Sequence, residues 1–129
     1  MRHAKIIIPI VILFLLVIGS SIFATSTLTS SSKNLERQVS QIEDSAKDGS
    51  WDKAKESLAS VENDWSKTEK VWTVLLDHIE IDNIDTTISR LSMFIEAKDK
   101  SLTLGEAAAL KQYVKHIPEK DSFKLKNIL

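Results

Sequence analysis

Near its N-terminus this chain carries an apolar run that is too long for the core of a small soluble domain. The stretch IIIPIVILFLLVIGSSIFA, residues 6–24, contains no charged side chain over nineteen residues. As an α-helix rising about 1.5 Å per residue it would be roughly 28 Å long, close to the hydrocarbon thickness of a bilayer. The sequence therefore predicts a transmembrane anchor over residues 6–24.

The charges around this run predict its orientation. Arg2, His3 and Lys5 precede the run, whereas the first charge after it is Lys33. Basic residues stay preferentially on the cytoplasmic side of a membrane. We therefore expect a single-pass protein of the cell membrane, with residues 1–5 in the cytoplasm and an extracytoplasmic helical domain over residues 33–129.

The end of the anchor leaves alternatives open. A cleaved secretory signal also has a basic start and an apolar run. Its cleavage site would lie near Gly19-Ser20-Ser21, however, and apolar residues continue past that point to Ala24, so we favour an uncleaved span. The polar stretch TSTLTSSS, residues 25–32, then predicts a juxtamembrane linker, with a frayed continuation of the span as the alternative.

The composition after the anchor is typical of helices. The 129 residues include only three glycines and two prolines, and β-branched residues do not alternate with polar ones. About a hundred residues can hold one modest core. The predicted fold is therefore all-α, with the N-terminal transmembrane helix followed by a small antiparallel bundle of about four helices, of the helical-hairpin type.

All the tryptophans of the chain lie on one predicted helix. Counting in sevens gives the a and d positions of its heptads: Trp51, Leu58, Trp65, Trp72 and Ile79, and Ala54, Val61, Thr68 and Leu75. An aromatic stripe at this spacing predicts a core face. The alternative is a groove for a ligand or partner, lined by Trp51, Trp65 and Trp72, because an indole N–H can stay at a surface.

Similar stripes predict the other helices. Their members are Leu35, Val39, Ile42 and Ala46; then Ile81, Ile84, Ile88, Leu91 and Ile95; and finally Ala107, Leu110, Val114 and Ile117. Gly49 predicts a helix C-cap. Asp82 predicts an N-cap where the stripe changes phase, and the capping box T-L-G-E predicts a helix start at Thr103. Pro118 is expected to end the last helix, and the apolar residues of the tail, 121–129, are expected to pack on the bundle.

The densest polar cluster is DHIEIDNID, residues 77–85. A metal or proton-sensing site would use His78 with Asp82 or Glu80, together with His116 at the end of the last helix. The alternative is helix-end electrostatics, in which acids stabilise a helix start and histidines a helix end. We favour the alternative, so that neither a metal nor a cofactor is predicted.

The remaining composition narrows the function classes. Seventeen basic against eighteen acidic residues, without runs of like charge, do not predict nucleic-acid binding. The chain has no cysteine, which removes disulfides and thiolate sites. Nucleophile elbows, zinc-protease motifs and phosphate-binding glycine loops do not occur. We therefore do not expect an enzyme.

With the anchor and the spaced tryptophans, the segment SRLSMFIEAKD (residues 89–99) and the terminal KNIL (residues 126–129) complete a pattern. The chain resembles an uncharacterised family of small single-span helical proteins from endospore-forming Gram-positive bacteria, known as a domain of unknown function. The resemblance implies a membrane-anchored envelope protein whose gene can lie beside that of another membrane protein, and it leaves a role in sporulation open.

The sequence thus predicts an extracytoplasmic interaction or assembly module, with the membrane and another envelope membrane protein as partners. The alternative is a small sensor or ligand-binding ectodomain, which requires a concave apolar pocket between helices. The identity of the partner and the oligomeric state stay open at this point.

Overall fold

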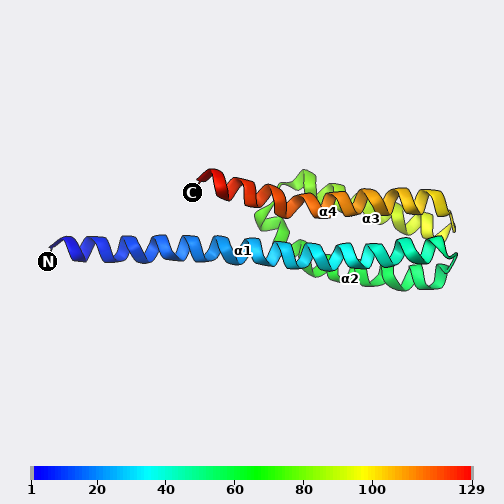
Figure 1. Cartoon of the computed structure of the whole chain (residues 1–129), viewed down its shortest axis with the longest axis horizontal. Coiled ribbons are helices and arrows are strands. Elements are labelled where there is room, and N and C mark those ends of the chain that lie inside the picture. Colours follow the sequence, from blue (N-terminus) through cyan, green and yellow to red (C-terminus); the bar gives the residue numbers. More distant parts are fainter. Residues whose placement is uncertain (1, 129) are drawn as a thin grey trace.

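The computed structural model describes the backbone of residues 2–128 and the side chains of residues 2–24 and 26–117. This part of the chain is all-α and forms an up-and-down bundle (Figure 1). Its helices are α1 (Arg2–Lys47), α2 (Trp51–Leu75), α3 (His78–Glu96) and α4 (Lys100–Ile128). In the bundle α1 packs against α2 and α4, and α3 packs against the same two neighbours.

The apolar run and the first bundle helix are one continuous helix. Residues 25–32, for which we expected a linker, are helical within α1. Leu28 and Ser32 are buried in the bundle, because Leu28 lies one heptad before Leu35 and extends the same apolar face. The packed domain therefore begins before residue 33, and the first part of α1 projects beyond the other helices (Figure 1).

The bundle core is built from the apolar stripes of all four helices. Its buried members include Leu35, Val39 and Ile42 of α1, Ala54, Leu58, Val61, Trp65 and Trp72 of α2, Ile81, Ile84, Ile88, Leu91 and Ile95 of α3, and Ala107, Leu110, Val114 and Ile117 of α4. The predicted periodicity and the observed core agree at these positions. Burial of these faces is the main source of stability for such a bundle.

Two of the turns close on a residue with left-handed backbone. Gly49 has a φ of 70°, and the N–H of Ser50 donates to the carbonyl five residues earlier (2.8 Å). Lys98 has a φ of 55°, and the N–H of Asp99 makes the equivalent bond (3.0 Å). Both are Schellman motifs, which satisfy the last carbonyls of a helix. Glycine adopts this conformation freely, whereas a lysine adopts it under strain.

The break between α2 and α3 lies earlier than predicted. α2 ends at Leu75, and α3 begins at His78 with Asp77 in the N-cap position, so the prediction of an N-cap at Asp82 is wrong. Any of the acids in this segment suits a helix start, and the phase change of the stripe does not choose among them. Because the chain turns before it, Ile79 leaves the tryptophan stripe and is 73 % exposed.

The fourth helix also begins earlier than predicted. Asp99 is its N-cap, since its carboxylate accepts a hydrogen bond from the N–H of Leu102 (3.0 Å). Thr103 is buried in the first turn of α4. The expected helix start at Thr103 is therefore wrong, because the Schellman turn at Lys98 brings Asp99 into the capping position first.

The predicted stop at Pro118 is also wrong, since α4 continues to Ile128. A proline lacks the N–H that would bond the carbonyl four residues earlier, here that of Val114. The hydroxyl of Ser32 on α1 donates to this Val114 carbonyl (2.8 Å), and the bond is buried. A neighbouring helix thus satisfies the acceptor that the proline leaves open. The tail residues expected to pack on the bundle lie outside the described side chains.

Candidate functional site

The tryptophans are the first candidate that the sequence singled out. Trp65 is 4 % exposed and Trp72 is fully buried. Their rings meet edge to face, with centroids 5.4 Å apart and planes at 80°, which is a favourable aromatic geometry. Trp51, at the start of α2, is partly buried and packs against the same core. The structure therefore uses Trp65 and Trp72 as core residues, and Trp65 also contacts α3 through Asp85.

An acidic cluster lies at the outer edge of this contact. The indole N–H of Trp65 donates to a carboxylate oxygen of Asp85 on α3 (2.6 Å). Partial burial of Glu69 on α2, a side-chain hydrogen bond with Asp85, and the charges of Asp85 and Asp82 raise the pKa of Glu69. The cluster joins α2 to α3, and the repulsion among its carboxylates weakens this link as Glu69 ionises.

The predicted metal candidates are spread over two helices. His78 is the first residue of α3, and Asp82 lies four residues later on the same helix. Both side chains are exposed, and His116 is an exposed residue of α4. Within the described residues no group of three or more His, Cys, Asp or Glu could hold a metal ion. His78 at the start of α3 also differs from the helix-end position expected for it.

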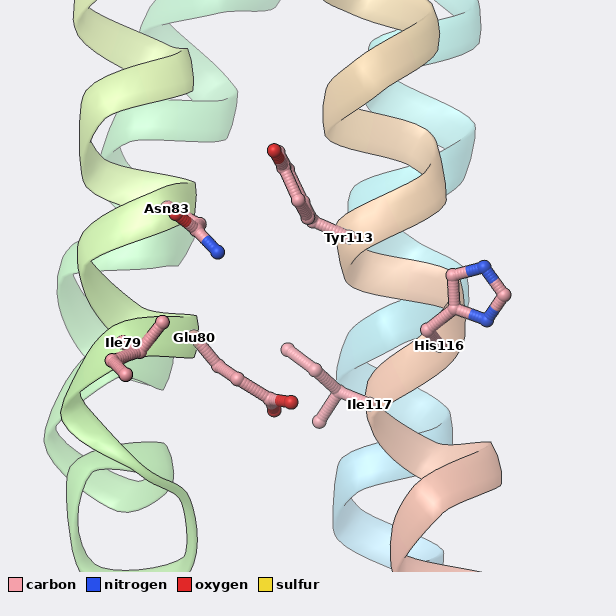
Figure 2. Close-up of a pocket in the computed structure, with 6 residues that line it drawn as sticks. All are labelled: Ile79, Glu80, Asn83, Tyr113, His116 and Ile117. Carbon is pink, nitrogen blue, oxygen red and sulfur yellow. The ribbon is translucent and has the colours of Figure 1, made fainter.

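A pocket of about 270 Å³ lies between α3 and α4. Its lining residues are Ile79, Glu80, Asn83, Tyr113, His116 and Ile117. Figure 2 shows Glu80 and Asn83 reaching from α3 toward α4, and Tyr113 and Ile117 reaching back toward α3. The pocket combines apolar walls with polar groups able to orient a ligand. It lies apart from Trp65 and Trp72, so the tryptophans do not form its wall.

A long apolar surface covers the N-terminal half of α1. The large apolar side chains from Ile6 to Val17, together with Ile22 and Phe23, are exposed. By length and composition α1 is the one helix in the described part of the chain that could cross a membrane, and a signal sequence would share these properties. Apolar surface of this extent on a helix indicates a site that something apolar covers.

A second apolar surface was missed by the sequence reasoning. Val71, Val74 and Leu75 at the end of α2 and Ile79 at the start of α3 are exposed and form what we call the apolar tip. The heptad count had placed Leu75 and Ile79 in the core. The sequence did contain a sign of this surface. Val71 and Val74 are apolar, yet they lie outside the a and d positions of that count and therefore off the predicted core face.

The profile of a family described as "Domain of unknown function (DUF4363)" matches residues 22–128.

The chain belongs to the DUF4363 family.

The DUF4363 match begins at Ile22, near the end of the apolar run, and continues through the bundle to the penultimate residue. It confirms the expected membership of an uncharacterised family. The single span, the envelope location and the endospore-forming source stay predictions. Neither the curated proteins nor the solved structures contain a significant match to the chain.

Proposed function

We propose that this DUF4363 protein is a single-pass membrane protein whose extracytoplasmic helical bundle is an interaction or assembly module. The observation that carries the proposal is the continuity of α1. Its first half presents exposed apolar side chains, and its second half contributes Leu35, Val39 and Ile42 to the bundle core. A bilayer covers the first half, and the unbroken helix joins the bundle directly to the membrane surface.

The orientation follows from the charges at the two ends of the apolar run. Arg2 and Lys5 precede it, and the next charge is Lys33. The positive-inside rule then directs the N-terminus to the cytoplasm and the bundle to the outside. The apolar run continues past Gly19 to Ala24, beyond the point expected for signal cleavage, and this favours a retained anchor.

The assembly role rests on the form of the bundle. Its tryptophans fill the core and do not line a groove, and a packed helical domain on a rigid stalk suits a scaffold for another membrane protein. The resemblance described above favours an envelope membrane protein as the partner. A connection with sporulation rests on that resemblance alone.

A second candidate function is ligand binding, and the pocket between α3 and α4 favours it. Glu80, Asn83 and Tyr113 place polar groups beside the apolar Ile79 and Ile117 (Figure 2). A small amphipathic molecule fits this chemistry. In this reading the bundle is a sensor or binding ectodomain held at the membrane surface.

The assembly role is tested by purification of the full chain from its own membranes in mild detergent, without crosslinking. A second membrane protein should co-purify with it. The matched control keeps residues 1–25 and replaces the bundle with an unrelated soluble domain, and this control should not retain the partner. Recovery of the full chain alone, under conditions that preserve other envelope complexes, would count against the assembly role and favour ligand binding.

A further inference from the structure

The apolar tip is an unusual surface for a helical bundle in water. Val74 is 83 % exposed and Ile79 is 73 % exposed, while Val71 and Leu75 are exposed beside them. Val71, Val74 and Leu75 are spaced three and four residues apart, so they share one face of α2. Ile79 lies just past the turn, near the start of α3, and is exposed as well. The neighbouring side chains of Lys70, Asp77 and His78 are exposed and polar or charged.

The position of the apolar tip along α1 follows from the helix lengths. α2 runs antiparallel to α1, and its 25 residues rise at the same rate as those of α1. Counting back along α1 from Lys47 by the length of α2 reaches the level of Phe23, at the end of the apolar run. In Figure 1 the turn between α2 and α3 lies beside the middle of α1, and the backbone of α4 extends past this turn toward the N-terminal end of α1.

The end of α2 that carries the apolar tip is anchored in the bundle core. Trp72 is fully buried, and in the sequence it lies between Val71 and the other tip residues, the first of which is Val74. α1 enters the bundle without a break. An α1 that crosses a bilayer over residues 6–24 therefore brings the tip to the boundary between lipid and water.

From this placement we propose that the apolar tip, Val71, Val74, Leu75 and Ile79, inserts into the outer surface of the same bilayer that α1 crosses. The proposal rests on the proposed membrane anchor. Four side chains are a small surface compared with the 20 to 30 residues per side of a stable protein interface. Apolar residues surrounded by polar ones are typical of elements that lie in the membrane interface. Lipid is therefore the occupant that the geometry favours over a second protein chain.

The absence of cysteine from the chain makes the test direct. Val74→Cys and Ile79→Cys each carry a nitroxide label at the tip of the full-length protein, which is reconstituted in phosphatidylcholine vesicles. Leu13→Cys labels the anchor, and Ser101→Cys labels the exposed far end of the bundle. Collisions of each label with oxygen, which partitions into lipid, are compared with collisions with a water-soluble nickel chelate.

The expected result is a ratio of oxygen to nickel collisions at Val74 and Ile79 that is several-fold higher than at Ser101 and lower than at Leu13. If Leu13 is shielded from nickel while the tip labels behave like Ser101, the tip does not contact lipid, although the anchor stands. If the Leu13 label is itself aqueous, the anchor fails and this proposal fails with it. Shielding of the tip labels from both oxygen and the nickel chelate would show a protein contact and overturn the proposal. Broadening of the nitroxide spectrum by the label of a second copy of the protein would do the same.

Discussion

The hydrogen bond from Ser32 to the Val114 carbonyl makes a quantitative prediction about the contact between α1 and α4. Ser32→Ala removes the donor and leaves a buried carbonyl without a partner, because Pro118 has no N–H to supply. An unsatisfied buried acceptor costs about 1 to 3 kcal/mol. We therefore expect Ser32→Ala to lower the free energy of unfolding by roughly 2 kcal/mol.

Pro118→Ala supplies the matched background for this measurement. The introduced alanine carries an N–H that can bond the Val114 carbonyl within α4. In that background the carbonyl keeps one partner when Ser32 is replaced, and the cost of Ser32→Ala should fall to about 0.5 to 1 kcal/mol, the net worth of one ordinary hydrogen bond. The two substitutions should therefore be coupled by about 1 kcal/mol or more.

The assay is urea unfolding followed by far-ultraviolet circular dichroism. A fragment from Ser26 to Leu129 suits it, because this fragment retains the buried Leu28 and Ser32 while lacking the apolar run. Ser30→Ala is the control, since Ser30 is an exposed residue of the same helix and should change stability by less than about 0.5 kcal/mol. Equal costs of Ser32→Ala with and without the proline would refute the reasoning.

Three further expectations concern the core, the turns and the acidic cluster, and all are measured on the same fragment. Trp65→Ala and Trp72→Ala should each lower stability by roughly 3 to 5 kcal/mol and Trp51→Ala by clearly less; losses below about 1 kcal/mol at both buried positions would contradict a core role. Lys98→Gly should stabilise by about 0.5 to 1 kcal/mol and Gly49→Ala should destabilise by about 1 kcal/mol, and effects of the same sign would speak against the left-handed turns. Because the pKa of Glu69 is raised in the folded state, its contribution to stability is fully present below its unfolded pKa and is lost as pH rises through the folded pKa. Glu69→Gln should remove this pH-dependent loss of stability, and the variant should be slightly more stable than wild type at pH 7. An identical dependence of stability on pH in both proteins would refute the raised pKa of Glu69.

Hydrophobic periodicity was sufficient to predict most of the core. The series Ile81, Ile84 and Ile88 and the series Ala107, Leu110 and Val114 are buried as their spacing indicates. The reason is physical: a helix that packs on neighbours must place its apolar residues three and four positions apart. The number of helices can also be predicted, because the apolar spacing changes register where one helix ends and the next begins.

The helix ends were harder to predict, because several residues could serve each one. Asp77 and Asp82 are equally suited to cap α3, and Asp99 and Thr103 to cap α4; the choice depends on turns that periodicity does not encode. Pro118 was expected to stop α4, yet a hydroxyl on another helix compensates for its missing N–H. Contacts between helices distant in sequence decide such cases.

The candidate site shows the same limit. The tryptophans could be placed on one face from their spacing, but the pocket lined by Glu80 and Tyr113 joins α3 to α4, and no local pattern connects these residues. The apolar tip became recognisable only when the end of α2 at Leu75 was known. Local spacing predicts faces, whereas the three-dimensional arrangement decides which faces remain uncovered.

The orientation of the chain in the membrane is the property on which the proposed function depends, and labelling of intact cells measures it. Ser101→Cys and His3→Cys place single thiols at exposed positions on opposite sides of the apolar run. With a membrane-impermeant maleimide, Ser101→Cys should be labelled on intact cells and His3→Cys only after permeabilisation, and both labelled proteins should retain the mass of the full chain. Labelling of Ser101→Cys only after permeabilisation, or loss of the N-terminal segment from the mature protein, would contradict a retained anchor that holds the bundle outside the cell.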